Sequence, residues 1–135
     1  NLCPKLIYLK ILAPNGPKVE NSFIEGFNIF ELEKSIKFLI KKFTLNTREL
    51  IVLVNDEEKI QKIRIQLSSY PILKEMVSLD FDNKKINIMT IKNIKGLESK
   101  AVLIWGKLDE LSENKIYVSM SRARSLLAIT ELKNY

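Results

Sequence analysis

Residues 101–105 read AVLIW, and this uninterrupted apolar run stands between two polar clusters. A second run of the same kind, LIVLV, occupies residues 50–54. Short apolar runs bounded by polar residues are typical of strands that are buried on both faces, as in a parallel sheet. The two runs therefore predict the centre of an α/β fold.

Strand and helix patterns alternate around these two runs. Short apolar segments bounded by polar and turn residues predict further strands at residues 5–12, 77–81, 86–91 and 126–130. Apolar residues at helical spacing predict helices over 28–43, over 57–68, and from 109 or 112 to about 124. Asn28 and the pair Asn55-Asp56 are the expected N-caps of the first two helices. Residues 72–76 predict a short helical turn, and residues 82–85 either a hairpin or the loop of a connection. This alternation favours a three-layer, mostly parallel sheet with flanking helices.

The length and composition favour one globular domain. A chain of 135 residues can bury one core and is too short for two, so a single domain over residues 1–135 is expected. The first residue is Asn1 and not Met, so we expect a fragment of a longer chain. The single Cys3 precludes an intramolecular disulfide and favours a reducing, cytoplasmic location. No apolar run approaches the roughly 18 residues that a membrane span needs, and no membrane partner is expected.

The excess of basic over acidic residues is evidence about the kind of binding partner. The formal net charge is +6, which favours a polyanion such as nucleic acid or a nucleotide. A biased genome that fills the surface with lysine would produce the same balance. Charge alone leaves both interpretations open.

The polar cluster before the 101–105 run is Lys95-Gly96-Leu97-Glu98. A glycine lets the backbone approach a phosphate or ribose that a side chain would block. A nearby carboxylate can accept hydrogen bonds from ribose hydroxyls. The alternative is an ordinary loop glycine followed by a solvated glutamate.

The cluster after the run contains Arg122 and Arg124, near the end of the last predicted helix. Guanidinium groups in a half-buried segment are costly unless they pair with anions. Their planar arrangement of N–H donors suits phosphate oxygens. The alternative is a pair of arginines that stabilise a helix C-terminus, each by less than about 1 kcal/mol.

Together the two clusters resemble the fifth and sixth motifs of superfamily 1 helicases of the UvrD/Rep type. The first motif is matched by Thr90, Lys95, Gly96, Leu97 and Glu98, and the second by Tyr117, Val118, Ser121, Arg122, Ala123 and Arg124. The resemblance implies the second motor subdomain (2A), with a RecA-like sheet of the P-loop NTPase type. It also implies that Lys95, Gly96 and Glu98 face the nucleotide, with Glu98 on its sugar. Arg122 would be the arginine finger, and Arg124 an orienting or ion-pairing residue.

The same resemblance implies two partners, single-stranded DNA and the N-terminal motor subdomain of the same protein. In the family the strand end at Thr90 and Lys92 contacts DNA phosphates. This sequence has Lys92 where histidine is usual and Ile94 where a small residue is usual. Lys92 can pair with a phosphate as a point charge, whereas Ile94 cannot donate a hydrogen bond.

A phosphate-cradling loop is missing from the sequence. The only glycines are Gly16, Gly26, Gly96 and Gly106, and none begins a G-x-x-x-x-G-K-[S/T] string. We therefore expect ATP and Mg²⁺ to be cofactors of the full-length protein, with neither bound by this chain alone. The isolated chain should not hydrolyse ATP.

Two other functions are compatible with the sequence. Asp80 and Asp82 with Glu98-x-Lys100 resemble the metal site of restriction-type nucleases. A non-catalytic module could grip nucleic acid through lysines and aromatic stacking. Metal-dependent cleavage by the isolated chain would separate the nuclease from the motor fragment.

Overall fold

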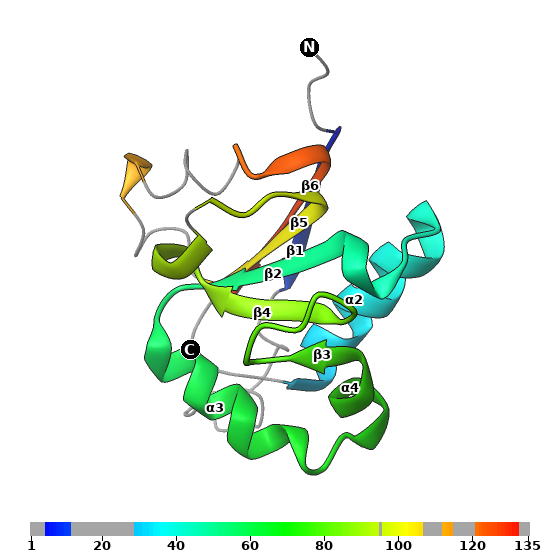
Figure 1. Ribbon diagram of the computed structural model, residues 1–135, viewed down its shortest axis with the longest axis vertical. Helices are drawn as coiled ribbons and strands as arrows, with labels where there is room; N and C mark the ends of the chain where they lie inside the picture. The colour runs from blue at the N-terminus through cyan, green and yellow to red at the C-terminus, as the bar shows by residue number, and fades with distance from the viewer. Residues whose placement is uncertain (1–4, 12–28, 95, 107–111, 115–120, 133–135) are drawn as a thin grey trace.

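The computed structural model describes residues 5–11, 29–94, 96–106, 112–114 and 121–132 (Figure 1). Six strands form one sheet in the order β1-β6-β5-β2-β4-β3, and every recorded strand pair is parallel. The strands are β1 (Lys5–Ile11), β2 (Leu50–Val54), β3 (Val77–Ser78), β4 (Ile86–Thr90), β5 (Ser99–Gly106) and β6 (Ala123–Leu132). The α-helices are α2 (Ile29–Phe43), α3 (Glu57–Leu67) and α4 (Pro71–Met76), and the 3₁₀ helices are η1 (Thr47–Glu49) and η2 (Ile91–Ile94). The prediction of a parallel α/β sheet with flanking helices is confirmed.

The two apolar runs are neighbours at the centre of the sheet. Residues 50–53 of β2 pair with residues 101–104 of β5. All five residues of β2 are buried. β5 lies between β2 and β6, so its backbone pairs on both sides. Its side chains are apolar in both directions because each face of the sheet carries a core cluster here, with Leu103 in one and Ile104 in the other.

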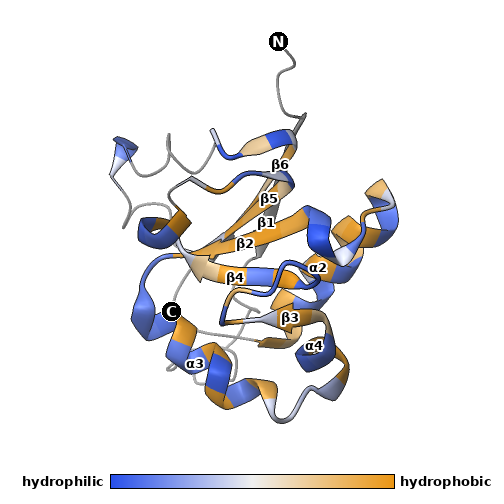
Figure 2. Cartoon of the chain, viewed as in Figure 1, coloured by the Kyte–Doolittle hydropathy of each residue, from blue (hydrophilic) through white to orange (hydrophobic). Residues whose placement is uncertain are grey.

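Helices α2, α3 and α4 cover one face of the sheet. Their buried side chains pack with the strands in one core cluster, which includes Leu32, Ile36, Ile63, Leu73, Val52 and Leu103. Hydrophobic residues fill the central strand β2, while the helices alternate hydrophobic and hydrophilic residues (Figure 2). This is the pattern of amphipathic helices laid on a buried sheet. None of the helices in the described ranges is long and apolar enough to span a membrane.

The opposite face carries a smaller core cluster. Ile51, Leu53, Val102, Ile104, Leu127 and Ile129 from the strands pack there with Ile91 and Ile94 of η2. Leu97 packs against the same cluster. The segment from η2 to Leu97 is therefore held on the sheet by apolar contacts.

The last predicted helix is wrong at its C-terminal end. Glu113 and Asn114 are helical, but Ser121 and Arg122 form a turn and β6 begins at Ala123. Residues 107–111 and 115–120, where the rest of that helix was expected, lie outside the described residues. Pairing with β5 extends the strand N-terminally, since Ala123 pairs with Ser99 ahead of the part of β6 that also pairs with β1. Arg124 is thus a strand residue.

β3 is shorter than predicted, with only Val77 and Ser78 of the expected 77–81. The chain turns directly after it, where the Ser78 hydroxyl donates to the Asp80 carbonyl oxygen. Because β3 and β4 are parallel, the hairpin alternative for residues 82–85 is wrong and the connecting loop is right. The Asn87 side chain holds this loop, with its Oδ1 accepting from Asp82 N–H at 2.8 Å.

The other boundaries agree closely with prediction. α3 begins behind Asp56, whose Oδ1 accepts from Lys59 N–H at 3.1 Å as an N-cap should. The Pro71 helix and the start of β4 also lie where the patterns indicated. The predicted cap at Asn28 lies outside the described residues.

Candidate nucleotide and nucleic-acid sites

Glu98 and Arg122 come together because they precede neighbouring parallel strands. Ser99 pairs with Ala123, and Ser99 N–H donates to the Arg122 carbonyl oxygen at 3.0 Å. The segments that lead into β5 and β6 therefore run side by side (Figure 1). Glu98 is exposed and Arg122 is half-buried. The backbone thus places Glu98 and Arg122 side by side, although they are 24 positions apart (122 minus 98).

Two polar atoms at this place are enclosed. Ser99 is 4% exposed, and its Oγ has no hydrogen-bond partner among the described residues. The Nε of Arg122 is likewise buried without a partner in the described part of the chain. Leaving such groups unpaired costs about 1–3 kcal/mol each. An anionic oxygen from a ligand or from another domain would offset that cost at Arg122.

The side-chain groups of Glu98 and Arg122 are of the types that bind nucleotides. A guanidinium suits phosphate oxygens, and an exposed carboxylate can accept from ribose hydroxyls. Arg122 and Glu98 supply these two groups. Lys95 lies outside the described residues. Arg124 is exposed within β6, two positions into the strand.

Gly96 has a backbone conformation that favours glycine. Its φ is +76°, and a Cβ added there would meet nothing within 4 Å. Leu97 N–H donates to the Ile94 carbonyl oxygen at 2.9 Å, which closes the turn after η2. The requirement for glycine is therefore conformational, and the space around it is open.

Gly96→Ala is expected to lower the free energy of unfolding by about 1–2 kcal/mol, because a Cβ is disfavoured at positive φ. Urea denaturation followed by the fluorescence of the single, buried Trp105 would measure the change. Gly96→Asn is the matched control and should lose less, since asparagine tolerates this conformation. Equal stability of Gly96→Ala and the parent would contradict the expectation.

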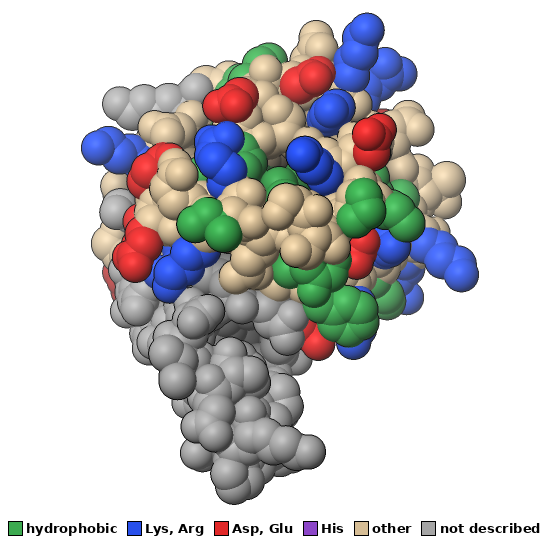
Figure 3. Space-filling model, turned by 90° about the horizontal axis from the view of Figure 1, so that it is seen from below, with side chains coloured by type: hydrophobic (Ala, Val, Ile, Leu, Met, Phe, Trp, Pro, Cys, Tyr) green, Lys and Arg blue, Asp and Glu red, His purple; other side chains and the backbone are tan. Residues whose placement is uncertain are grey.

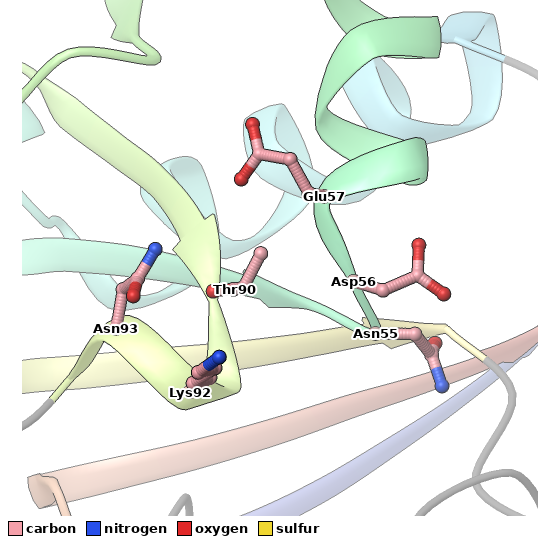
Figure 4. A pocket seen from close by; sticks show the side chains of 6 residues that line it. All are labelled: Asn55, Asp56, Glu57, Thr90, Lys92 and Asn93. Atoms are coloured by element: carbon pink, nitrogen blue, oxygen red, sulfur yellow. The ribbon is translucent and has the colours of Figure 1, made fainter.

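A separate pocket of about 330 Å³ lies where β2 and β4 end. Its lining comes from two stretches of chain: the β2–α3 loop with the first residue of α3, and the end of β4 with η2 (Figure 4). The lining residues are Asn55, Asp56, Glu57, Thr90, Lys92 and Asn93. Val54 pairs with Thr90 across the two strands, so the residues that follow each strand meet. The pocket brings together Thr90 and Lys92, the two residues predicted to contact DNA.

The carboxylates of the pocket are already engaged within α3. Asp56 caps the helix, and its Oδ2 lies 3.8 Å from Lys59 Nζ. Glu57 Oε2 accepts from Gln61 Nε2 at 3.2 Å. Lys92 is exposed, and no ion pair is recorded for it among the described residues. Beside these carboxylates, the pocket presents the Lys92 ammonium, the Thr90 hydroxyl and the Asn93 amide to a ligand.

Asn55 was predicted only as a capping residue, and Asn93 was not singled out. The signal for Asn55 was its place directly after an apolar run, since ligands bind beyond the carboxyl ends of parallel strands. Its side chain lies against Gly106 at the end of β5, where a Cβ would overlap Asn55 Oδ1. Gly106 thus makes room for the pocket residue Asn55, which follows β2.

The residues of the alternative nuclease site are not gathered. The Asp80 carboxylate lies 3.8 Å from Arg64 Nη1, and Asp82 Oδ1 accepts from Lys84 N–H at 2.9 Å. Within the described ranges, no group of three or more His, Cys, Asp or Glu side chains could hold a metal ion. The described geometry gives Asp82 the role of a turn residue.

A parallel α/β sheet with helices packed on it, in this arrangement, is a RecA-like fold. The chain is similar to the C-terminal domain of a possible DNA helicase from Lactobacillus plantarum WCFS1, a crystal structure, with a TM-score of 0.60 and 14% sequence identity. The match covers 97% of this chain and 74% of that one. No protein-family model matches the sequence, and no curated protein matches it either. The similarity shows the fold.

Proposed function

We propose that this chain is the C-terminal motor subdomain (2A) of an ATP-dependent DNA helicase of the superfamily 1 UvrD/Rep type. The observation that carries the proposal is the pairing of Ser99 with Ala123, next to which Glu98 and Arg122 stand on neighbouring strands. These two residues match motif positions that contact the nucleotide in the resembled family, and the backbone pairing makes them neighbours. The similarity to a helicase C-terminal domain supports the same function.

In this proposal the chain forms one wall of an ATP site. Glu98 accepts hydrogen bonds from the ribose hydroxyls, and Lys95 and Gly96 bind the same nucleotide. Arg122 reaches the γ-phosphate, where a guanidinium neutralises negative charge, and Arg124 orients neighbouring groups. A phosphate-cradling loop on the N-terminal motor subdomain would hold the β-phosphate and Mg²⁺. ATP, when bound, would supply the free energy for movement along DNA.

The pocket at the ends of β2 and β4 is the proposed contact with single-stranded DNA. The Thr90 hydroxyl and the Lys92 ammonium would bind phosphate oxygens. The exposed Lys92 is suited to bind a phosphate, because it forms no ion pair with a carboxylate in the described ranges. A coupled motor also needs a link between its two sites. Residues 91–98 supply it, since Ile91, Ile94 and Leu97 pack on the same face of the sheet.

Glu98→Ala tests the ribose contact in a protein that also carries the phosphate-cradling domain. We expect the KM for ATP to rise about tenfold or more with a smaller change in kcat, because a hydrogen bond to a charged acceptor contributes about 1.5–3 kcal/mol. Steady-state ATPase assays with saturating single-stranded DNA would measure both constants.

Glu75→Ala is the matched control for that experiment, because Glu75 is an exposed glutamate of α4, outside both sites. It should leave KM unchanged. If Glu98→Ala and Glu75→Ala gave the same KM, Glu98 would not contact the nucleotide.

A further inference from the structure

Helix α2 exposes aromatic and basic side chains in alternation along one row. Phe30, Lys34, Phe38 and Lys42 follow one another at four-residue spacing, which places them on one face of a helix. Phe30 is 48% exposed and Phe38 is 43% exposed, whereas the other face of α2 is buried in the core. We call these four residues the Phe/Lys row.

Each ring of the Phe/Lys row lies beside an ammonium group. Lys34 Nζ is 5.4 Å from the centroid of the Phe30 ring, and Lys42 Nζ is 5.8 Å from that of Phe38. These distances lie within the range of cation–π attraction. The rings and the charges are therefore presented together on the surface.

The C-terminal part of α2 is strongly basic. Residues 34–43 include Lys34, Lys37, Lys41 and Lys42 and no acidic residue. Glu31 and Glu33, in the preceding turn, pair with Lys34 at 3.7 Å and with Lys37 at 3.4 Å. No ion pair is recorded for Lys41 or Lys42 among the described residues. The row thus ends in unneutralised positive charge.

The neighbouring helix α3 differs in this respect. Its basic residues Lys59, Lys62 and Arg64 each lie within 4.0 Å of a carboxylate. In the view from below, acidic and basic side chains are mixed over the described part of the surface (Figure 3). Unlike α3, α2 therefore carries lysines, Lys41 and Lys42, for which the described part of the chain shows no ion pair.

We propose that the Phe/Lys row of α2 binds single-stranded nucleic acid without sequence preference, as a surface separate from the pocket at Thr90 and Lys92. Exposed aromatic faces stack with unpaired bases, and lysines beside them pair with the phosphates. Protein interfaces are depleted in lysine, which makes a protein partner a poorer fit to this row. A duplex buries its base faces in its own stack and would use only the lysines. The surface does not depend on the proposed motor function, because stacking needs no bound nucleotide.

The test measures binding of a fluorescently labelled oligothymidylate to the full 135-residue chain by anisotropy. Phe30→Leu/Phe38→Leu keeps apolar bulk and helix propensity but removes the rings. It should weaken binding about tenfold or more, given the usual contribution of stacked bases. Phe81→Leu is the matched control, because Phe81 is 64% exposed and lies outside α2. Circular dichroism would verify that all variants fold.

The charges are tested through the dependence of affinity on salt. Lys34→Gln/Lys42→Gln should reduce the slope of log K against log salt by about 1.4, since each phosphate contact on a single strand contributes about 0.7. Lys62→Gln/Lys74→Gln removes the same charge from α3 and α4 and should change the slope less.

Several results would overturn the proposal. These are no measurable binding by the parent chain, equal affinity of the double-leucine variant and the parent, or equal weakening by Phe81→Leu. A parent chain that dimerises through these rings in sedimentation velocity, with a double-leucine variant that is monomeric and binds DNA normally, would assign the row to a second copy of this chain. ATPase activity enters none of these measurements, so failure here and failure of the motor function are distinguishable.

Discussion

Arg122→Ala is expected to lower ATP hydrolysis by about 10³-fold or more in a protein that also carries the phosphate-cradling domain, while ATP still binds. The guanidinium is proposed to act on charge that develops at the γ-phosphate during the reaction. Its loss should therefore reduce kcat far more than it raises the KM for ATP. Single-turnover hydrolysis and equilibrium binding of a labelled ATP analogue would measure the two effects separately.

Two further variants sharpen this experiment. Arg122→Lys retains the charge but loses the planar fork, so most of the loss should persist. Arg124→Ala removes an exposed arginine two positions into β6 and should cost much less. Near-normal turnover by Arg122→Ala would remove Arg122 from the mechanism. It would also contradict the proposal that Glu98 and Arg122 form half of an ATP site.

Leu103→Ala is expected to lower the free energy of unfolding by about 2–5 kcal/mol, the range for leucine truncation in a core. Leu103 is fully buried in β5. It pairs with Val52 of β2 and Ala128 of β6, so it lies at the centre of the sheet. Because the free energy of unfolding of a domain is typically about 5–15 kcal/mol, this single substitution removes a large part of it. Urea denaturation followed by Trp105 fluorescence would measure it.

Ile65→Ala is the control for Leu103→Ala, since Ile65 is 74% exposed on α3. It should change the free energy of unfolding by about 0.5 kcal/mol or less. A loss at Leu103 no greater than that at Ile65 would contradict the central position of β5. The denaturant slope should stay the same in both variants if unfolding remains two-state.

The strongest structural predictions came from local patterns with a direct physical cause. The apolar runs at 50–54 and 101–105 predicted buried parallel strands, because only a strand enclosed on both faces is apolar in both directions. The Asp56 cap and the short helix predicted at residues 72–76 depend on backbone hydrogen bonds within a few residues. Such features need no knowledge of the rest of the chain.

The weakest predictions concerned segments whose state depends on distant partners. Residues up to 124 were predicted to be helical, yet Arg124 lies in β6, which pairs with β1 at the other end of the chain. Residues 79–81 were predicted to extend β3, yet the chain turns there and the Ser78 hydroxyl donates to the Asp80 carbonyl oxygen. Local propensity was overridden by pairing in the first case and by a side-chain hydrogen bond in the second.

For the candidate sites, the sequence alone determined which chemical groups are present: Glu98 and Arg122 at one site, Thr90 and Lys92 at the other. Only the tertiary structure decided which of them meet. The parallel pairing of β5 with β6 brings residues 98 and 122 side by side, and the pairing of β2 with β4 adds Asn55 and Asp56 to the pocket of Thr90. The physical reason is that strand order is set by burial of the whole sheet, which no short segment encodes by itself.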